Sequence, residues 1–306
     1  MSQCTSALVM VPPKDFSFNS ETGADNGFQQ RLALSSEQIR QQAMVEFKQM
    51  VAKLSQAGVQ VLVFEPEQNG AKTMPDAVFP NNWFTTAADG TLAVYPMATE
   101  NRRREVQPQQ LRAFLQRQGF TVNHLQDWRA QAQSGEYLEG TGVMVFDHQH
   151  KRLYAARSLR CHTRLLEACA SAREYQLQAF DTRLSTGEPV YHTNVMMSVG
   201  EGFAVICDEV IVKSQREKVI SALKQHHEVI SISETQLGQF CGNILQMKTT
   251  RGEPLILMSQ SAFDGFTRQQ KDQLSRHGKL LPFAIPTIEQ IGGGSVRCML
   301  AEIFLP

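Results

Sequence analysis

The sequence predicts an α/β fold in which ββαβ units repeat around a closed ring. Three observations support this prediction: four β-hairpin patterns recur along the 306 residues, each precedes a helical pattern, and each helical pattern precedes another short β-like run. Short Pro/Gly-rich tracts fall at predicted turns, and none separates two regions of different composition. We therefore expect residues 1–306 to form a single domain.

The first hairpin pattern shows the plan of the unit. Residues 82–86 and 91–97 are rich in β-prone side chains, and the Ala-Ala-Asp-Gly run between them predicts a tight turn. Three later pairs of segments follow the same plan: 141–146 with 152–156, 194–199 with 203–207, and 243–247 with 255–258.

Helical patterns follow these hairpins at residues 110–115, 164–169 and 215–220. A further helix is expected to begin at the cap candidates Ser35 and Ser36 and to be followed by a strand at residues 59–64. This N-terminal unit lacks a second strand. Pairing of residues 298–304 with residues 7–10 would complete it as the fifth unit and close the ring.

Composition narrows the classes of partner. Hydrophobic residues make up 42% of the chain, and 30 basic residues balance 30 acidic ones, so no net charge directs it toward nucleic acid or an anionic membrane. No apolar run approaches the roughly 18 residues of a membrane span, and we expect a cytoplasmic protein with a small-molecule partner. Self-association into a homo-oligomer is left open.

Cysteine and glycine patterns predict neither a metal nor a cofactor. The six cysteines are scattered, which favours reduced thiols. The pairs Cys161-His162 and His226-His227 lack a second pair at ligand spacing, so a surface or packing role is favoured over zinc. The glycines at 292–294 open a predicted strand, not a phosphate-binding helix.

Reactive side chains stand at or near the openings of the units: Asn81 and Asn82, Glu139, His192, and Cys298. Equivalent strand starts would converge near the axis of a ring and assemble a site from distant segments. The glycine run before Cys298 permits a close backbone approach, and Arg297 places positive charge beside the thiol, which favours a nucleophile.

Each residue also has a structural alternative. Free cysteines are usually buried for packing, and a hydrogen-bonded structural histidine would look like His192. Glu139 is also compatible with a carboxylate in the first turn of a helix, and Asp76 with a turn residue after proline.

At these residues the chain resembles the guanidino-group-modifying enzymes, the pentein superfamily that includes arginine deiminase and dimethylarginine dimethylaminohydrolase. Four motifs occur in the family order: Phe-Pro-Asn-Asn at 79–82, Leu-Glu-Gly at 138–140, His-Thr-Asn at 192–194 and Gly-Gly-Ser-Val-Arg-Cys-Met at 293–299. The resemblance implies a fivefold pseudosymmetric α/β propeller, in agreement with the repeat.

The resemblance also implies roles for site residues. Cys298 would attack the central carbon of the substrate, His192 would shuttle protons, and Glu139 would hold a substrate nitrogen. Asp76 would contact the amino-acid end of the substrate, and Arg160, in a Ser-x-Arg motif, would receive the α-carboxylate. For the run 102–104 of three arginines, a solvated charged face is favoured over a second carboxylate contact.

Asn82 and Asn194 depart from the superfamily pattern, because many guanidine-binding relatives carry aspartates there. A guanidinium only donates hydrogen bonds, whereas a ureido group also has a carbonyl acceptor, and an asparagine NH2 can donate to that oxygen. The asparagines resemble those of the citrulline-utilization hydrolase branch. We therefore predict hydrolysis of citrulline, with an arginine deiminase-type reaction and a non-catalytic binding platform as alternatives.

Overall fold

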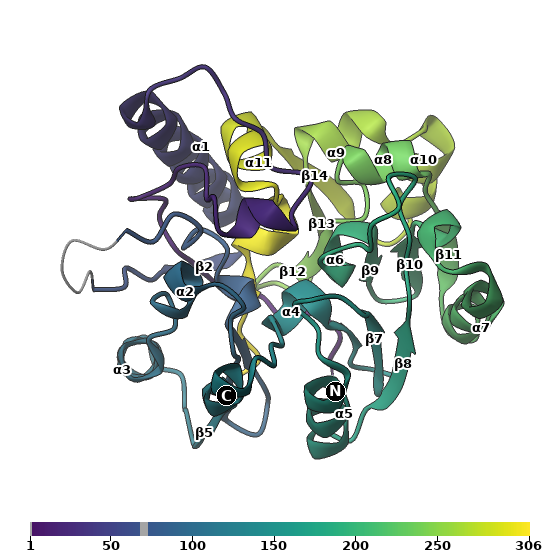
Figure 1. Cartoon of the computed structure of the whole chain (residues 1–306), viewed down its shortest axis with the longest axis horizontal. Coiled ribbons are helices and arrows are strands. Elements are labelled where there is room, and N and C mark those ends of the chain that lie inside the picture. Colours follow the sequence, from purple (N-terminus) through teal and green to yellow (C-terminus); the bar gives the residue numbers. More distant parts are fainter. Residues whose placement is uncertain (1, 68–72) are drawn as a thin grey trace.

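The computed structural model describes residues 2–67 and 73–306 (Figure 1). In these residues the strands form five three-stranded sheets. In each sheet the middle strand pairs antiparallel with one neighbour and parallel with the other, as ββαβ units require. The sheets are β3 (Phe84–Thr86), β4 (Thr91–Val94) and β5 (His124–Asp127); β6 (Val145–Asp147), β7 (Arg152–Ala156) and β8 (Gln176–Phe180); β9 (Met197–Val199), β10 (Phe203–Ile206) and β11 (Glu228–Ser231); β12 (Leu245–Lys248), β13 (Pro254–Ser259) and β14 (Lys279–Phe283); and β15 (Ala301–Glu302), β1 (Ala7–Met10) and β2 (Gln60–Val63).

Helices connect the parallel strands of each sheet, as the sequence predicted. These crossover helices are α1 (Ser36–Gln56), α3 (Pro108–Arg117), α5 (Thr163–Ala172), α7 (Lys213–Lys224), and the pair α9 (Gln260–Gly265) and α10 (Arg268–Ser275). Between units lie the 3₁₀ turn η3 (Arg129–Ser134) and the short helices α8 (Glu234–Gly238) and α11 (Pro286–Gly292). Within units, ahead of the crossover helix, lie α2 (Glu100–Arg103) and the 3₁₀ turns η1 (Thr22–Ala24) and η4 (Asp208–Val210).

Helix α1 shows how local sequence and packing agree. The Ser35 side chain accepts from the backbone N–H of Gln38, and the Gln38 side chain accepts from the backbone N–H of Ser35, which forms a capping box. Side chains at helical spacing then face the interior: Ile39, Ala43, Phe47, Met50 and Leu54.

The first and last strands pair, as the sequence predicted. Leu8 lies opposite Glu302 and Val9 opposite Ala301 in an antiparallel ladder between β1 and β15. This pairing involves fewer residues than the segment 298–304 that was expected to be a strand.

Three segments expected to begin as strands are helical turns. These are α4 (Gly140–Val143), α6 (Thr193–Met196) and η5 (Val296–Met299), and the strand of each unit begins only after the turn. A fourth turn, η2 (Pro80–Asn82), precedes β3. Helix α4 contacts η2 and α6, and η2 contacts η5, so these turns meet one another. Local β-propensity was misleading here because packing between units decides the conformation.

Apolar side chains between the sheets and their helices form four buried clusters in the described residues. All six cysteines lie in the described ranges and are free thiols. Across residues 2–67 and 73–306, no helix is both long and apolar enough to span a membrane.

Candidate active site

The turns that open the units surround a small buried cavity. Asn82 from η2, His192 immediately before α6 and Cys298 from η5 line it together with Asp76, Arg102 and Arg160. Its solvent-accessible volume of ≈ 10 Å³ is about what one water molecule requires. One cavity therefore brings together five of the predicted site residues: Asp76, Asn82, Arg160, His192 and Cys298.

The Cys298 thiol lies among amide groups. The Asn243 Nδ2 lies 3.3 Å from Sγ, and the Asn194 Nδ2 lies 3.6 Å from it. Burial raises the pKa of the Cys298 thiol, and hydrogen bonds from Asn243 and Asn194 partly oppose that effect. The thiol is therefore protonated near neutral pH. The amide NH2 groups of Asn243 and Asn194 lie where they can donate hydrogen bonds to a thiolate.

The positive charge of Arg297 is paired with a carboxylate of the protein. Its guanidinium donates to the backbone carbonyl of Leu300 at 2.9 Å and forms an ion pair with Glu302 at 3.0 Å. Arg297 still lowers the pKa of the Cys298 thiol through its charge, but burial outweighs this effect, and the guanidinium makes its direct contacts with Leu300 and Glu302.

His192 and Glu139 form a buried pair. The His192 Nε2 lies 2.8 Å from Glu139 Oε2. Burial disfavours ionisation of Glu139, but Arg160 and His192 together hold its pKa well below the ordinary value. Burial also lowers the pKa of His192, although Glu139 opposes this shift. A neutral His192 that donates Nε2–H to the carboxylate has its Nδ1 lone pair available as a base.

The contacts of Glu139 differ from the predicted role of holding a substrate nitrogen. Its Oε1 accepts from the backbone N–H of Ala98 at 2.9 Å, and its Oε2 contacts His192 and Arg160. Both oxygens are engaged with protein donors, which suits a group that orients His192.

Two glycines allow this close packing. Gly140 has φ 45°, and a Cβ there would lie 2.5 Å from the backbone oxygen of Asn81. At Gly142 a Cβ would lie 2.4 Å from Asn82 Nδ2 and 2.9 Å from the His192 ring. A side chain at position 142 would therefore not fit beside Asn82 and His192.

Arg102 sets the orientation of the Asn82 amide. The Arg102 Nη1 donates to Asn82 Oδ1 at 2.7 Å, and the remaining guanidinium nitrogens bind Glu105 and the backbone carbonyls of Phe79 and Asp76. Because a guanidinium only donates, the carbonyl of Asn82 must face Arg102. Its Nδ2 is buried without a hydrogen-bond partner in the described residues and is left for the cavity. Arg102 is only 2% exposed, so the predicted solvated face is wrong at this position.

Asp76 and Asn81 differ in their access to the cavity. Asp76 Oδ2 accepts from Asn19 at 2.7 Å and Thr22 at 2.9 Å, whereas Oδ1 is buried without a partner in the described residues. Burial raises the pKa of Asp76, although Arg102 opposes the shift. Asn81 is fully buried, donates to Thr141 Oγ1 at 3.2 Å and does not line this cavity.

Arg160 is already paired with a carboxylate of the protein. Its Nε donates to Asp25 Oδ2 at 2.8 Å, Nη2 also binds Asp25, and Nη1 lies 3.4 Å from Glu139. Asp25 belongs to residues 19–30, which we call the covering segment. In Figure 1 this purple segment lies beside α11, near the centre of the view, and its Asn26 and Gln29 donate to backbone carbonyls of the glycine run.

Sequence reasoning missed Asn243, Asp25 and the role of Arg102. Asn243 opens the fourth unit and lies two residues before its strand, as Asn82 does in the first unit. Asn194 and Cys298 each lie three residues before theirs, so the repeat itself contained the signal. Asp25 and Arg102 lie outside the motifs, and only the tertiary structure connects them with the site.

The sequence of this chain was compared with models of known protein families, and one family matches. Residues 12–305 match the model described as N,N dimethylarginine dimethylhydrolase, eukaryotic. The chain belongs to this family. Membership confirms the predicted guanidino-group-modifying superfamily and makes the chain a hydrolase that acts on carbon–nitrogen bonds outside peptides. Among curated proteins, a search found no match.

Solved structures share the fold. The N-terminal domain of ArgZ, an arginine dihydrolase of Cyanobacteria, was solved with bound substrate and has a TM-score of 0.70 at 16% identity, over 98% of this chain and 99% of that domain. Dimethylarginine dimethylaminohydrolase, as a variant carrying an S-methyl-L-thiocitrulline adduct, gives 0.62 at 13% identity over 98% and 99% of the two chains. Unliganded AgrE gives 0.72 at 13% identity, but the match covers 97% of this chain and only 39% of AgrE.

Proposed function

We propose that the chain is a cysteine-dependent hydrolase of a ureido amino acid, citrulline, and that it produces ornithine and carbamate. In this proposal it belongs to the citrulline-utilization branch of its superfamily and acts in the cytoplasm. Family membership supports the class of reaction. The choice of a ureido substrate comes from the site.

The observation that carries the proposal is the orientation of Asn82. Arg102 holds the amide carbonyl, so the unpartnered NH2 of Asn82 is the group that a substrate meets. A donor at this place suits the carbonyl oxygen of a ureido group and opposes a guanidinium, which has only donors. Because the site is buried, a mismatched pair of donors would be costly.

The same donor assists the reaction. As Cys298 Sγ attacks the ureido carbon, the thiol proton passes to His192 and negative charge collects on the former carbonyl oxygen, where the Asn82 NH2 stabilises it. The bond to the side-chain nitrogen of ornithine then breaks, and that nitrogen takes the proton from His192. A carbamoyl thioester on Cys298 remains.

Water completes the reaction. His192 accepts a proton from water as it attacks the thioester, the carbon–sulfur bond breaks, and carbamate and the free thiol are produced. Glu139 keeps His192 oriented through the 2.8 Å contact in both halves of the reaction. Asn194 and Asn243 stabilise the sulfur while it carries negative charge.

The ends of the substrate have partners as well. The free Oδ1 of Asp76 would receive the α-ammonium group, and Arg160 would receive the α-carboxylate after Asp25 releases it. Asn81 is a predicted site residue that does not line the cavity, so it would act indirectly, through its hydrogen bond to Thr141.

The proposed arrangement of the whole chain is a fivefold pseudosymmetric propeller of residues 1–306. The openings of all five units contribute to the site: Asn82 from the first, Glu139 from the second, His192 and Asn194 from the third, Asn243 from the fourth and Cys298 from the fifth. A pseudo-fivefold axis through the site is the simplest arrangement that brings the openings of five units together.

The test is a comparison of substrates with the purified protein. Citrulline and arginine are supplied separately, and ornithine, citrulline and ammonia are measured over time. We expect ornithine from citrulline at a rate at least tenfold above that of any product from arginine, and no activity in Cys298→Ala. Conversion of arginine alone would overturn the ureido proposal in favour of a deiminase-type reaction.

A further inference from the structure

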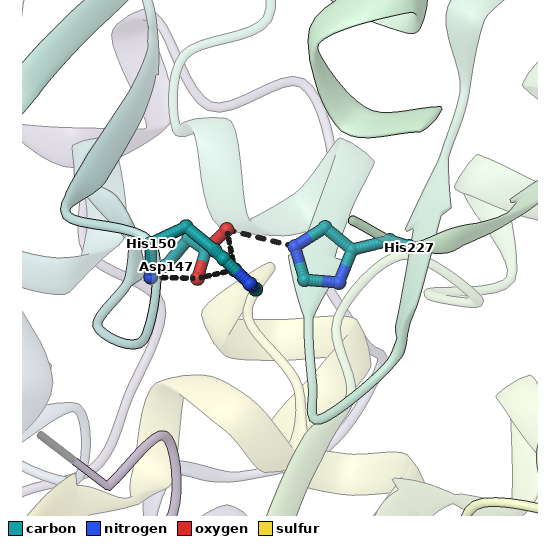
Figure 2. Close-up of side chains that lie close together, drawn as sticks. All are labelled: Asp147, His150 and His227. Atoms are coloured by element: carbon teal, nitrogen blue, oxygen red, sulfur yellow. Dashed lines mark hydrogen bonds and ion pairs between the residues drawn. The ribbon is translucent and has the colours of Figure 1, made fainter. Parts of the chain in front are cut away.

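Three side chains outside the proposed active site converge where two sheets meet (Figure 2). Asp147 is the last residue of β6, His150 lies in the turn to β7, and His227 directly precedes β11. Strand β6 contacts β9 of the sheet that contains β11. The cluster therefore links the second ββαβ unit to the third.

The donor atoms are spaced almost as metal ligands. Asp147 Oδ2 lies 2.7 Å from His227 Nε2, and Asp147 Oδ1 lies 2.9 Å from His150 Nδ1. One ligand atom from each residue lies within 4.8 Å of the other two. Zinc–ligand bonds of about 2.0–2.1 Å in a tetrahedron place neighbouring ligands roughly 3.3 Å apart, so small side-chain shifts would admit an ion.

The cluster is also held in place before any ion binds. The backbone N–H of His150 donates to Asp147 Oδ1 at 3.1 Å, which fixes the turn, and the His226 ring stacks on the His150 ring at 3.8 Å with an interplanar angle of 4°. The Nδ1 of His227 is buried without a hydrogen-bond partner in the described residues, so hydrogen bonding holds that ring through Nε2 alone.

Burial leaves one open side. Asp147 and His227 have side chains that are only 1% exposed, whereas the His150 side chain is 30% exposed. Two imidazole nitrogens and one carboxylate are a ligand set that zinc prefers, with a fourth position free for water. A divalent ion would replace the two N–H protons that now lie between the rings and the carboxylate.

We propose that Asp147, His150 and His227 bind Zn²⁺ or a similar divalent transition-metal ion, which joins the two units at this surface. The sequence pattern predicted no metal, because the ligands come from two separate segments and only folding combines them. The site uses none of the proposed catalytic residues, so the proposal stands independently of the substrate.

The experiment uses Cys298→Ala protein, because the thiol and His192 of the active site would otherwise compete for zinc. Titration calorimetry with zinc chloride should give one equivalent bound, and zinc should raise Tm by about 3 °C or more. Adding His150→Ala should weaken binding at least tenfold, while His124→Ala, at an exposed histidine of β5, should leave it unchanged.

A second measurement does not depend on altering the cluster. Co²⁺ bound to the Cys298→Ala protein should give the visible absorption of a tetrahedral or five-coordinate nitrogen and oxygen site, without a thiolate-to-cobalt charge-transfer band. The absence of stoichiometric zinc binding to Cys298→Ala, or equal affinity in the His150→Ala and His124→Ala proteins, would overturn the proposal.

Discussion

At the scale of single residues, the proposed preference for a ureido substrate depends on which end of the Asn82 amide faces the cavity. Asn82 has a donor and an acceptor, and Arg102 removes the acceptor by binding Oδ1 at 2.7 Å. Arg102 is in turn fixed by its buried ion pair with Glu105 at 2.8 Å. Arg102 thus leaves the NH2 of Asn82, a hydrogen-bond donor, as the group that faces the cavity, although Arg102 itself need not contact the reacting atoms.

Asn82→Asp tests this arrangement. The carboxylate would still pair with Arg102, but its second oxygen would replace the NH2 donor and repel the charge that develops on the substrate oxygen. We expect kcat for citrulline to fall about 100-fold while Tm changes little. Gln116→Glu makes the same chemical change on an exposed face of α3 and should retain full activity. Unchanged citrulline turnover in Asn82→Asp would exclude Asn82 as the donor.

We expect Glu139 to make the stability of the protein depend on pH. Its pKa in the folded chain lies below the ordinary value of 4.5, so the carboxylate adds stability above about pH 4.5 and this contribution disappears as pH falls through the folded-state pKa. Glu139→Gln should therefore lower the free energy of unfolding by about 3 kcal/mol at pH 7, and by progressively less as the pH falls below 4.5.

The measurement is Tm of the two proteins between pH 3 and pH 7. Glu253→Gln, at an exposed glutamate, is the control and should follow the wild-type profile. A difference between wild type and Glu139→Gln that stays constant with pH would contradict a titrating contribution from Glu139.

At the scale of elements, the covering segment lies over the cavity beside the thiol. Its Thr22 and Asn26 line that cavity, and Asp25 binds the guanidinium of Arg160. Because a volume of ≈ 10 Å³ is too small for an amino acid, we expect residues 19–30 to move before a substrate enters. The Asp25–Arg160 ion pair would hold the segment over the cavity, and a substrate carboxylate would compete for the same guanidinium.

Asp25→Asn should open the segment more often. We expect Cys298 to react with iodoacetamide about tenfold faster, which corresponds to about 1.4 kcal/mol of lost stabilisation of the closed state. Peptide mass spectrometry measures the labelling, with buried Cys207 as an internal reference. Asp272→Asn, at an exposed aspartate of α10, should react like wild type. Equal rates in all three proteins would show that Asp25 does not hold the segment closed.

At the scale of the whole molecule, the two ends of the chain belong to one sheet. Ile303 follows β15, is 2% exposed, and donates its backbone N–H to the Ala7 carbonyl at 3.0 Å. Ile303→Ala should lower the free energy of unfolding by about 2–5 kcal/mol and lower Tm by roughly 5–15 °C. Val45→Ala removes an exposed side chain of α1 and should change Tm by less than about 2 °C.

Coincident midpoints by tryptophan fluorescence and far-UV circular dichroism would be expected for the single domain that the sequence predicts. If Ile303→Ala shifts neither midpoint, the pairing of the chain ends contributes little to global stability.

The repeat could be predicted because its signals are local. Helix α1 begins at its serine cap, and the hairpin of β3 and β4 turns at the Asp-Gly pair, as expected from neighbouring residues alone. The turns α4 and α6 could not be predicted in this way. Their sequences favour strands, but contacts among the units hold them as helical turns.

From the sequence alone, the repeating ββαβ plan, the superfamily and the candidate side chains Glu139, His192 and Cys298 could be predicted. Periodicity, turn residues and motif order are properties of nearby positions, so they can be recognised without a fold. Three contacts became known only from the folded chain: Arg102 binds the amide oxygen of Asn82, Asp25 binds Arg160, and Arg297 forms an ion pair with Glu302. Hydrogen-bond direction and charge compensation depend on groups that folding brings together from distant segments.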